Sequence, residues 1–147
     1  MCLIIDANCA LETLTPNPSP EFQPVIDAIM SNKAVMVRGG EKLLAEYKKL
    51  SSVWRFIVLL DRAGKSIVVS DSEVDRVQEA LVALGQLASD DPHIIALAQV
   101  SGARLLCSKD QNLHADFGNK EFLNKPRGSV YQNQSHTKLL RKCVHPA

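Results

Sequence analysis

The stretch that decides the fold is residues 90–110, DDPHIIALAQVSGARLLCSKD. It opens with the acid Asp91, continues as an apolar helix over 92–100 and turns at a glycine. An apolar strand over 104–107 follows and leads to a second acid, Asp110. In an open α/β sheet, ligands bind beyond the carboxyl ends of the strands. We therefore expect a functional site where this strand ends.

Length and composition indicate an ordinary globular domain. The chain has 147 residues, enough for one domain with its own core. A formal net charge of +1 argues against a general polyanion binder, and the four cysteines form no Cys-x-x-Cys pair that would indicate zinc. No apolar run approaches the roughly 20 residues that span a bilayer, and the N-terminus lacks the basic segment of a signal peptide. We expect a cytoplasmic protein that makes no membrane contact.

Short apolar segments alternate with amphipathic segments along the chain. Strands are expected at residues 2–5, 34–37, 65–69 and 104–107, with a short edge strand at 129–131. Helices are expected at residues 9–14, 20–31, 41–50, 52–62, 70–88, 92–100 and 110–117. This alternation predicts a three-layer α/β/α fold with a mainly parallel central sheet of four to five strands. The domain is expected to span residues 1–131, followed by a basic C-terminal tail or terminal helix over 132–147.

Four acidic residues lie at positions that such a fold is expected to bring to the same edge of the sheet. Asp6 follows the first strand, Glu46 lies on a helix, Asp91 opens a helix and Asp110 follows the fourth strand. Converging carboxylates repel one another and raise one another's pKa, so the cluster is costly unless a hard cation neutralises it. Mg²⁺ or Mn²⁺, held by a few carboxylates and keeping some waters, suits such a site. The expected chemistry is metal-assisted hydrolysis of a phosphodiester.

Each acid also has a purely structural interpretation. Asp6, Asp91 and Asp110 could each cap the helix that follows, and Glu46 could be a solvated surface residue. Taken singly, these interpretations are preferred. Taken together, acids at strand and helix ends on one expected edge are typical of a functional site.

These motifs resemble the PIN-domain family, nucleases that include the ribonuclease toxins of many prokaryotic toxin–antitoxin pairs. The family's apolar strand ending in Asp-x-Asn is matched by IIDAN at 4–8, and its helical Leu-Ala-Glu-aliphatic motif by LAEY at 44–47. Its Asp-x-x-Ile-x-Ala-x-Ala helix is matched at 91–98, and its Thr/Ser-x-Asp motif by SKD at 108–110. The resemblance covers roughly residues 2–117.

The resemblance implies a Mg²⁺- or Mn²⁺-dependent endoribonuclease. Its catalytic, metal-holding residues would be Asp6, Glu46, Asp91 and Asp110. The residues implied in orienting ligands or waters are Asn8, Ser108 and Asn112, and the candidates for binding phosphate are Arg38, Lys42 and Lys109. RNA is the implied substrate, and an antitoxin protein or a second copy of the chain are candidate partners, with the apolar helices at 20–31 and 52–62 as candidate surfaces.

Several assignments stay open at this point. Glu41 competes with Glu46, because the Gly-Gly turn before their helix leaves its start undefined. Asp90 competes with Asp91, although only Asp91 has the family's spacing to the isoleucine and alanines that follow. Asp116 is expected to have a surface role.

His93 and His114 flank the acids and are expected at the surface near the site. A rival function is a non-catalytic PIN-like nucleic-acid-binding or scaffold protein. Two other doubly wound classes fit less well. A receiver-type domain expects paired acids after its first strand and a lysine after its last, and a haloacid-type phosphatase expects Asp-x-Asp where this chain has Asp6-Ala7-Asn8.

Overall fold

The apolar segments form strands and the amphipathic segments form helices, as expected from the alternation. The computed structural model describes residues 2–142. In chain order its elements are β1 (Leu3–Ile5), α1 (Ala7–Thr13), α2 (Gln23–Met30), β2 (Met36–Arg38), α3 (Glu41–Lys48), α4 (Ser51–Arg62), β3 (Ser66–Val68), α5 (Asp71–Leu84), α6 (Pro92–Ser101), β4 (Leu105–Cys107), α7 (Gln111–Phe117), β5 (Ser129–Tyr131) and the 3-10 helix η1 (Gln134–Lys142).

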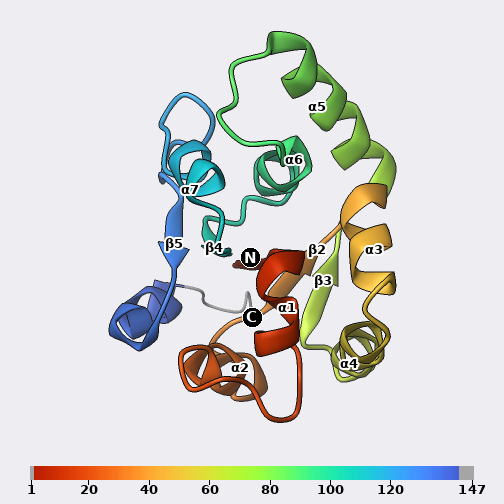
Figure 1. Cartoon of the computed structure of the whole chain (residues 1–147), viewed down its shortest axis with the longest axis vertical. Coiled ribbons are helices and arrows are strands. Elements are labelled where there is room, and N and C mark those ends of the chain that lie inside the picture. The colour runs from red at the N-terminus through yellow and green to blue at the C-terminus, as the bar shows by residue number, and fades with distance from the viewer. Residues whose placement is uncertain (1, 143–147) are drawn as a thin grey trace.

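The strands form one parallel sheet in the order β3-β2-β1-β4-β5, with helices packed around it (Figure 1). This confirms the predicted three-layer α/β/α fold. The chain builds β2 and β3 on one side of β1 and then crosses to add β4 and β5 on the other. Ile5 at the end of β1 pairs with Cys107 at the end of β4. The strand order reverses between these two strands, so their carboxyl ends form the switch point where such sheets open a ligand site.

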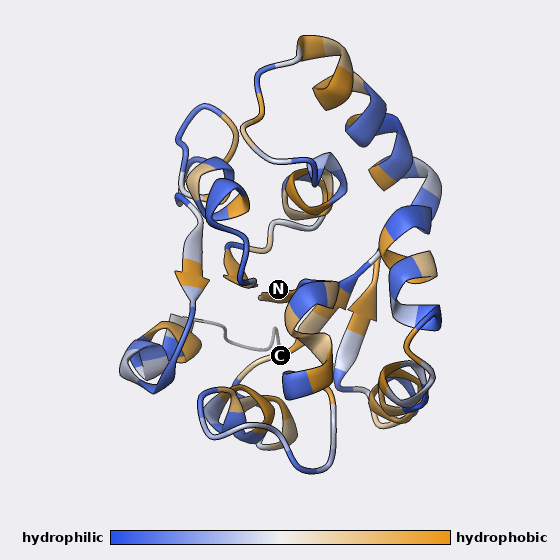
Figure 2. Ribbon diagram, in the orientation of Figure 1, coloured by the Kyte–Doolittle hydropathy of each residue, from blue (hydrophilic) through white to orange (hydrophobic). Residues whose placement is uncertain are grey.

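The centre of the sheet is fully apolar, while the helices around it have two faces. All three residues of β1 and of β4 are buried, which explains why these short runs show no polar alternation. In Figure 2 the outer helices carry both apolar and polar residues along their length. The helix α6 differs, because residues 93–98 are all buried. A helix that is apolar on every side belongs inside a protein.

Two helix boundaries differ from the sequence expectation by three residues or more, each for a local reason. The helix α5 ends at Leu84 rather than at residue 88, because Gly85 adopts a left-handed conformation with φ 62° and its N–H closes the last turn. Leu84, the last residue of the helix, is largely exposed. The helix α2 begins at Gln23 rather than at residue 20, and it is Pro24 that occupies its first turn.

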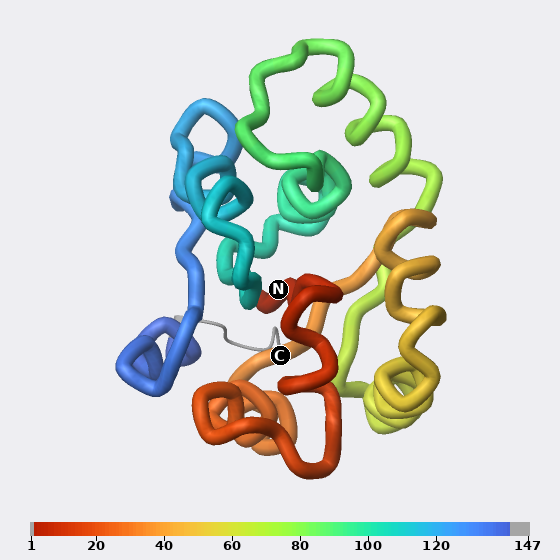
Figure 3. Tube along the Cα trace, viewed as in Figure 1, coloured from red at the N-terminus to blue at the C-terminus, as the bar shows by residue number. Residues whose placement is uncertain are grey.

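The segment after β5 packs against the rest of the chain over its described part. The helix η1 contacts α2 and β5, and the tube in Figure 3 shows η1 beside α2. Leu140 on η1 is only 4% exposed, and the hydroxyl of Tyr131 donates to the carbonyl of Glu21. Residues 143–147, which include the end of the expected tail, lie outside the described residues. Among residues 2–142, none of the helices is both long and apolar enough for a membrane span.

Candidate active site

Asp6 is held at the switch point by a small hydrogen-bond network from β4. Its side chain is buried, and the hydroxyl of Ser108 donates to its Oδ2 at 2.8 Å. The same hydroxyl oxygen accepts from Nδ2 of Asn8 at 3.3 Å and from the backbone N–H of Asp110 at 3.2 Å. Oδ1 of Asn8 in turn accepts from the N–H of Lys109. Ser108 and Asn8 therefore fix the ends of β1 and β4 relative to each other and orient the Asp6 carboxylate.

Glu46 reaches this point because its neighbour anchors α3 to β1. The hydroxyl of the fully buried Tyr47 donates to the carbonyl of Ile5, the residue before Asp6. Burial raises the pKa of the Asp6 carboxyl, donation by Ser108 lowers it, and the charge of Glu46 raises it. The alternative acid, Glu41, is exposed at the start of α3 and turns toward α5, where its N–H bonds Asp75. Of the two acids on α3, Glu46 is therefore the one whose charge acts on Asp6.

Asp91 approaches Asp6 from the start of α6. Burial raises the pKa of its carboxyl to about 6, and the charges of Asp6 and Asp110 and a contact with the Asp110 carboxyl contribute to this rise. Asp91 precedes the first turn of α6, yet within the described residues its side chain makes no capping hydrogen bond. Capping alone therefore does not explain Asp91. The alternative acid, Asp90, is exposed.

The side chain of Asp110 caps the helix that follows it, whereas among residues 2–142 that of Asp6 forms no such cap. Oδ1 of Asp110 accepts from the N–H of Asn112 at 2.9 Å and from that of Leu113 at 3.3 Å, so this side chain does cap α7. The side chain of Asp6 makes no such capping bond to α1 within the described residues, although the N–H groups of Ala7 and Asn8 lower its pKa. Asn112 is exposed in the first turn of α7, and a ring nitrogen of His114 pairs with the carbonyl of Ser108.

Asp116 braces the loop that delivers Asp91, and the expectation that it lies at the surface is wrong. The side chain is 3% exposed, and its two oxygens accept from the N–H groups of Ala88 and Ser89, each at 2.8 Å. The hydroxyl of Ser89 accepts from the N–H of Asp91 at 3.4 Å. The sequence carried a signal for this burial, because Asp116 follows the buried Leu113 by three residues and shares its helix face.

His93 is also buried rather than at the surface. Its side chain is 1% exposed, and its Nε2 lies 2.9 Å from Oε1 of Glu46. Burial and the charge of Lys42 lower the pKa of His93 to about 4, so the ring is neutral at pH 7 and the contact is not an ion pair. The signal in the sequence was the helix itself: a segment that is apolar on every side buries its first turn as well.

The three phosphate-binding candidates are not equivalent. Nη2 of Arg38 lies 2.6 Å from Asp61, and its guanidinium stacks over Trp54 at 5.4 Å from the ring centroid. Lys109 pairs with Glu12. Lys42 is exposed on α3, and its charge acts on both Glu46 and His93. Of the three, Lys42 is the cation best placed to meet an anionic ligand at the acids.

The donor chemistry of the acids fits a hard divalent cation, although their side chains do not meet at one point. The group offers carboxylate oxygens, the ligands that Mg²⁺ and Mn²⁺ prefer. Among residues 2–142, no three acid, histidine or cysteine side chains are close enough together to hold one ion as they stand. Local donors bind two of the acids, because Ser108 donates to Asp6 and the start of α7 donates to Asp110, and His93 lies close to Glu46.

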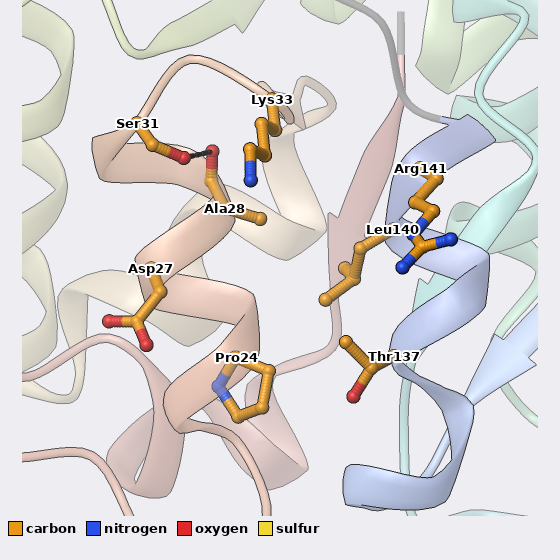
Figure 4. A pocket seen from close by; sticks show the side chains of 8 residues that line it. All are labelled: Pro24, Asp27, Ala28, Ser31, Lys33, Thr137, Leu140 and Arg141. Atoms are coloured by element: carbon orange, nitrogen blue, oxygen red, sulfur yellow. Dashed lines mark hydrogen bonds between the residues drawn. The ribbon is translucent and has the colours of Figure 1, made fainter.

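A separate hollow of about 280 Å³ lies between α2 and η1 and contains none of the four acids (Figure 4). Lys33 and Arg141 give it two cationic side chains, and Asp27 gives it an acid. It extends along α2 from Pro24 in the first turn to Ser31 just after the helix. The four acids of the candidate site are therefore separate from this hollow.

Comparison with known proteins leaves the family of the chain untested. A scan against protein-family models and searches of curated proteins and of solved structures gave no match. The resemblance to PIN-domain nucleases therefore stays a prediction that depends on the residues of this chain.

Proposed function

We propose that this chain is a metal-dependent endoribonuclease, with Asp6, Glu46, Asp91 and Asp110 holding Mg²⁺ or Mn²⁺. The observation that carries the proposal is the electrostatic coupling of these acids at the switch point of the sheet. The charges of Asp6 and Asp110 raise the pKa of Asp91, and the charge of Glu46 raises that of Asp6, with no lysine or arginine among the main causes at Asp6 or Asp91. Neighbouring acids, partly or fully buried, whose charges raise a neighbour's pKa are an arrangement that a divalent cation relieves.

Different residues of the chain would have different roles in the proposed hydrolysis. A bound ion of this class supplies Lewis acidity and activates water for attack on a phosphodiester. Ser108 orients the Asp6 carboxylate, and Tyr47 keeps α3 with Glu46 against the end of β1. Lys42 contacts a phosphate of the RNA backbone, which gives affinity without base sequence information.

A second candidate function, a non-catalytic PIN-like nucleic-acid-binding or scaffold protein, is favoured by one observation. The carboxylates of the described residues do not converge tightly enough to hold an ion as they stand. Asp110 in particular is engaged in capping α7. A chain that kept the fold for recognition alone would have this arrangement.

Partners beyond RNA are part of the proposal, since the PIN resemblance implies an antitoxin protein or a second copy of the chain. Each of the two helices expected to serve as contact surfaces leaves one large apolar side chain exposed. These are Met30 on α2 at 53% and Leu59 on α4 at 60%. Light scattering of the purified chain would report whether two copies associate.

The test is cleavage of end-labelled single-stranded and structured RNA in Mn²⁺, in Mg²⁺ and in EDTA. We expect metal-dependent cleavage that falls by about 100-fold or more in Asp91→Asn, the scale of losing a group that stabilises charge in a reaction. Asp90→Asn is the matched control, because the adjacent acid is exposed, and it should cleave like the wild type. Cleavage unchanged in Asp91→Asn would reject this site. Mn²⁺ binding without cleavage of any RNA would favour the scaffold function.

A further inference from the structure

The contact between α6 and α3 brings together two polar groups that lack other partners. Nε2 of His93 lies 2.9 Å from Oε1 of Glu46, but the two atoms are not aligned as a hydrogen bond. Among the described residues, both ring nitrogens of His93 and this oxygen of Glu46 are buried without any hydrogen-bond partner. Buried polar atoms are rarely left in this state, and each one calls for an explanation.

Within the described part of the chain, the surroundings of His93 offer its ring one candidate hydrogen-bond partner. With Nδ1 unpartnered, no second hydrogen bond fixes the tautomer, and the acceptor nearest to Nε2 is the Glu46 oxygen. The ring is 1% exposed, whereas the Glu46 side chain is 31% exposed and carries three rotatable bonds. Because the ring is enclosed and the carboxylate is partly exposed, a turn of the carboxylate at this distance would complete an N–H···O bond.

We propose that His93 is a positioning residue for Glu46: its Nε2–H holds Oε1 of the carboxylate and leaves the other oxygen to the metal ion. The inference rests on the proposed function and deepens it, because it assigns a partner to one of the four acids. Carboxylates that bind metals are themselves hydrogen-bonded, and loss of such a partner typically weakens metal affinity by roughly 10- to 100-fold. The effect should appear in ion binding itself, before any cleavage.

The test is the affinity for Mn²⁺, measured by calorimetry on the full chain with Leu and Gln at position 93. His93→Leu removes the N–H, and we expect Mn²⁺ binding to weaken by about 10-fold or more. His93→Gln keeps an amide N–H at a similar reach and should stay within about threefold of the wild type. In the Glu46→Gln background, His93→Leu should cause no further loss. Thermal unfolding of each variant without metal shows that the compared proteins are folded.

The outcomes separate this inference from the function on which it rests. Wild-type affinity in His93→Leu would overturn the positioning role and leave the metal centre standing. Equal losses in His93→Leu and His93→Gln would also overturn it, because they would indicate direct ligation by the imidazole or a packing defect. A loss that persists in the Glu46→Gln background would show that His93 acts through another residue. A wild-type chain that binds no Mn²⁺ would overturn both proposals.

Discussion

The negative charge of Asp91 destabilises the folded chain. Burial and two neighbouring acids raise its pKa from the ordinary 3.8 to about 6. Between these two values the folded state binds more protons than the unfolded state, so this group lowers the free energy of unfolding as pH rises from about 4 to 6. Above pH 6 the full cost is present. Because the carboxyl is partly solvated, the cost is about 1 kcal/mol rather than the larger value that the shift alone would give.

Asp91→Asn should therefore stabilise the metal-free chain at pH 7.5 by about 1 kcal/mol, and the gain should largely vanish near pH 4. Urea unfolding at both pH values, with EDTA present, measures this difference. The charge of Asp91 raises the pKa of His93, so its removal moves the titration of His93 to lower pH, and the ring is neutral at pH 7.5 in both proteins. Asp90→Asn, which neutralises the exposed neighbour, should show no such gain. A loss of stability in Asp91→Asn at pH 7.5 would contradict the prediction.

The acids of the site could be predicted from single residues, whereas their surroundings could not. Asp6 and Asp110 follow apolar strands, and that position in a parallel sheet is visible in the sequence. The sequence alone did not decide between Glu46 and Glu41. That decision required the hydrogen bond from Tyr47 to Ile5, which joins residues 42 positions apart. The burial of His93 was missed because a lone histidine next to acids is easily interpreted as a surface residue.

At the scale of elements, the loop between α5 and α6 depends on α7 for its conformation. Asp116 on α7 accepts two backbone N–H groups from this loop, and Ser89 in the loop accepts from the N–H of Asp91. Hydrogen bonds to a charged acceptor are stronger than those to a neutral one. The position of Asp91 is therefore set by an element that follows it in the chain by about 20 residues.

Asp116→Asn should lower the free energy of unfolding by about 1.5–3 kcal/mol, because the amide removes the charge and leaves one acceptor oxygen where two were used. It should also weaken Mn²⁺ binding, since the loop that carries Asp91 loses its brace. Urea denaturation and calorimetry measure the two effects. Glu121→Gln neutralises an exposed acid in the next turn and serves as the control. A stable variant with normal metal affinity would show that the loop holds its conformation without Asp116.

Element type was easier to predict than element length, and α5 shows why. Its start is marked by a cap, because the hydroxyl of Ser70 accepts from the N–H of Glu73. The end was placed too late because apolar residues continue past Gly85. A glycine in mid-helix and a glycine that ends a helix look alike in a sequence until tertiary contacts select one.

For the whole molecule, the alternation of apolar and amphipathic segments predicts the parallel α/β fold but not the strand order. The pairing of β1 with β4 joins residues about 100 positions apart, and no local pattern encodes it. Yet this pairing creates the switch point, and with it the meeting of Asp6 and Ser108. The site is therefore a property of the topology, while its individual acids can be read from the sequence.

The segment after β5 tests where the folded unit ends. A boundary at residue 131 would make the described part of that segment dispensable, but Leu140 on η1 is buried in the core. Leu140→Ala should lower the free energy of unfolding by about 2–3 kcal/mol, since it removes buried methyl groups and leaves a cavity. Lys138→Ala, an exposed change on the same helix, should have little effect on stability.

Urea unfolding of the two variants measures this difference, and Mn²⁺ affinity should stay at the wild-type value in both. The switch point is built by β1, α3, α6 and β4, and none of its acids contacts Leu140 through a hydrogen bond or ion pair among the described residues. A Leu140→Ala chain as stable as the wild type would place the end of the folded unit at β5. A stability loss accompanied by weakened metal binding would instead mean that η1 supports the geometry of the site across the sheet.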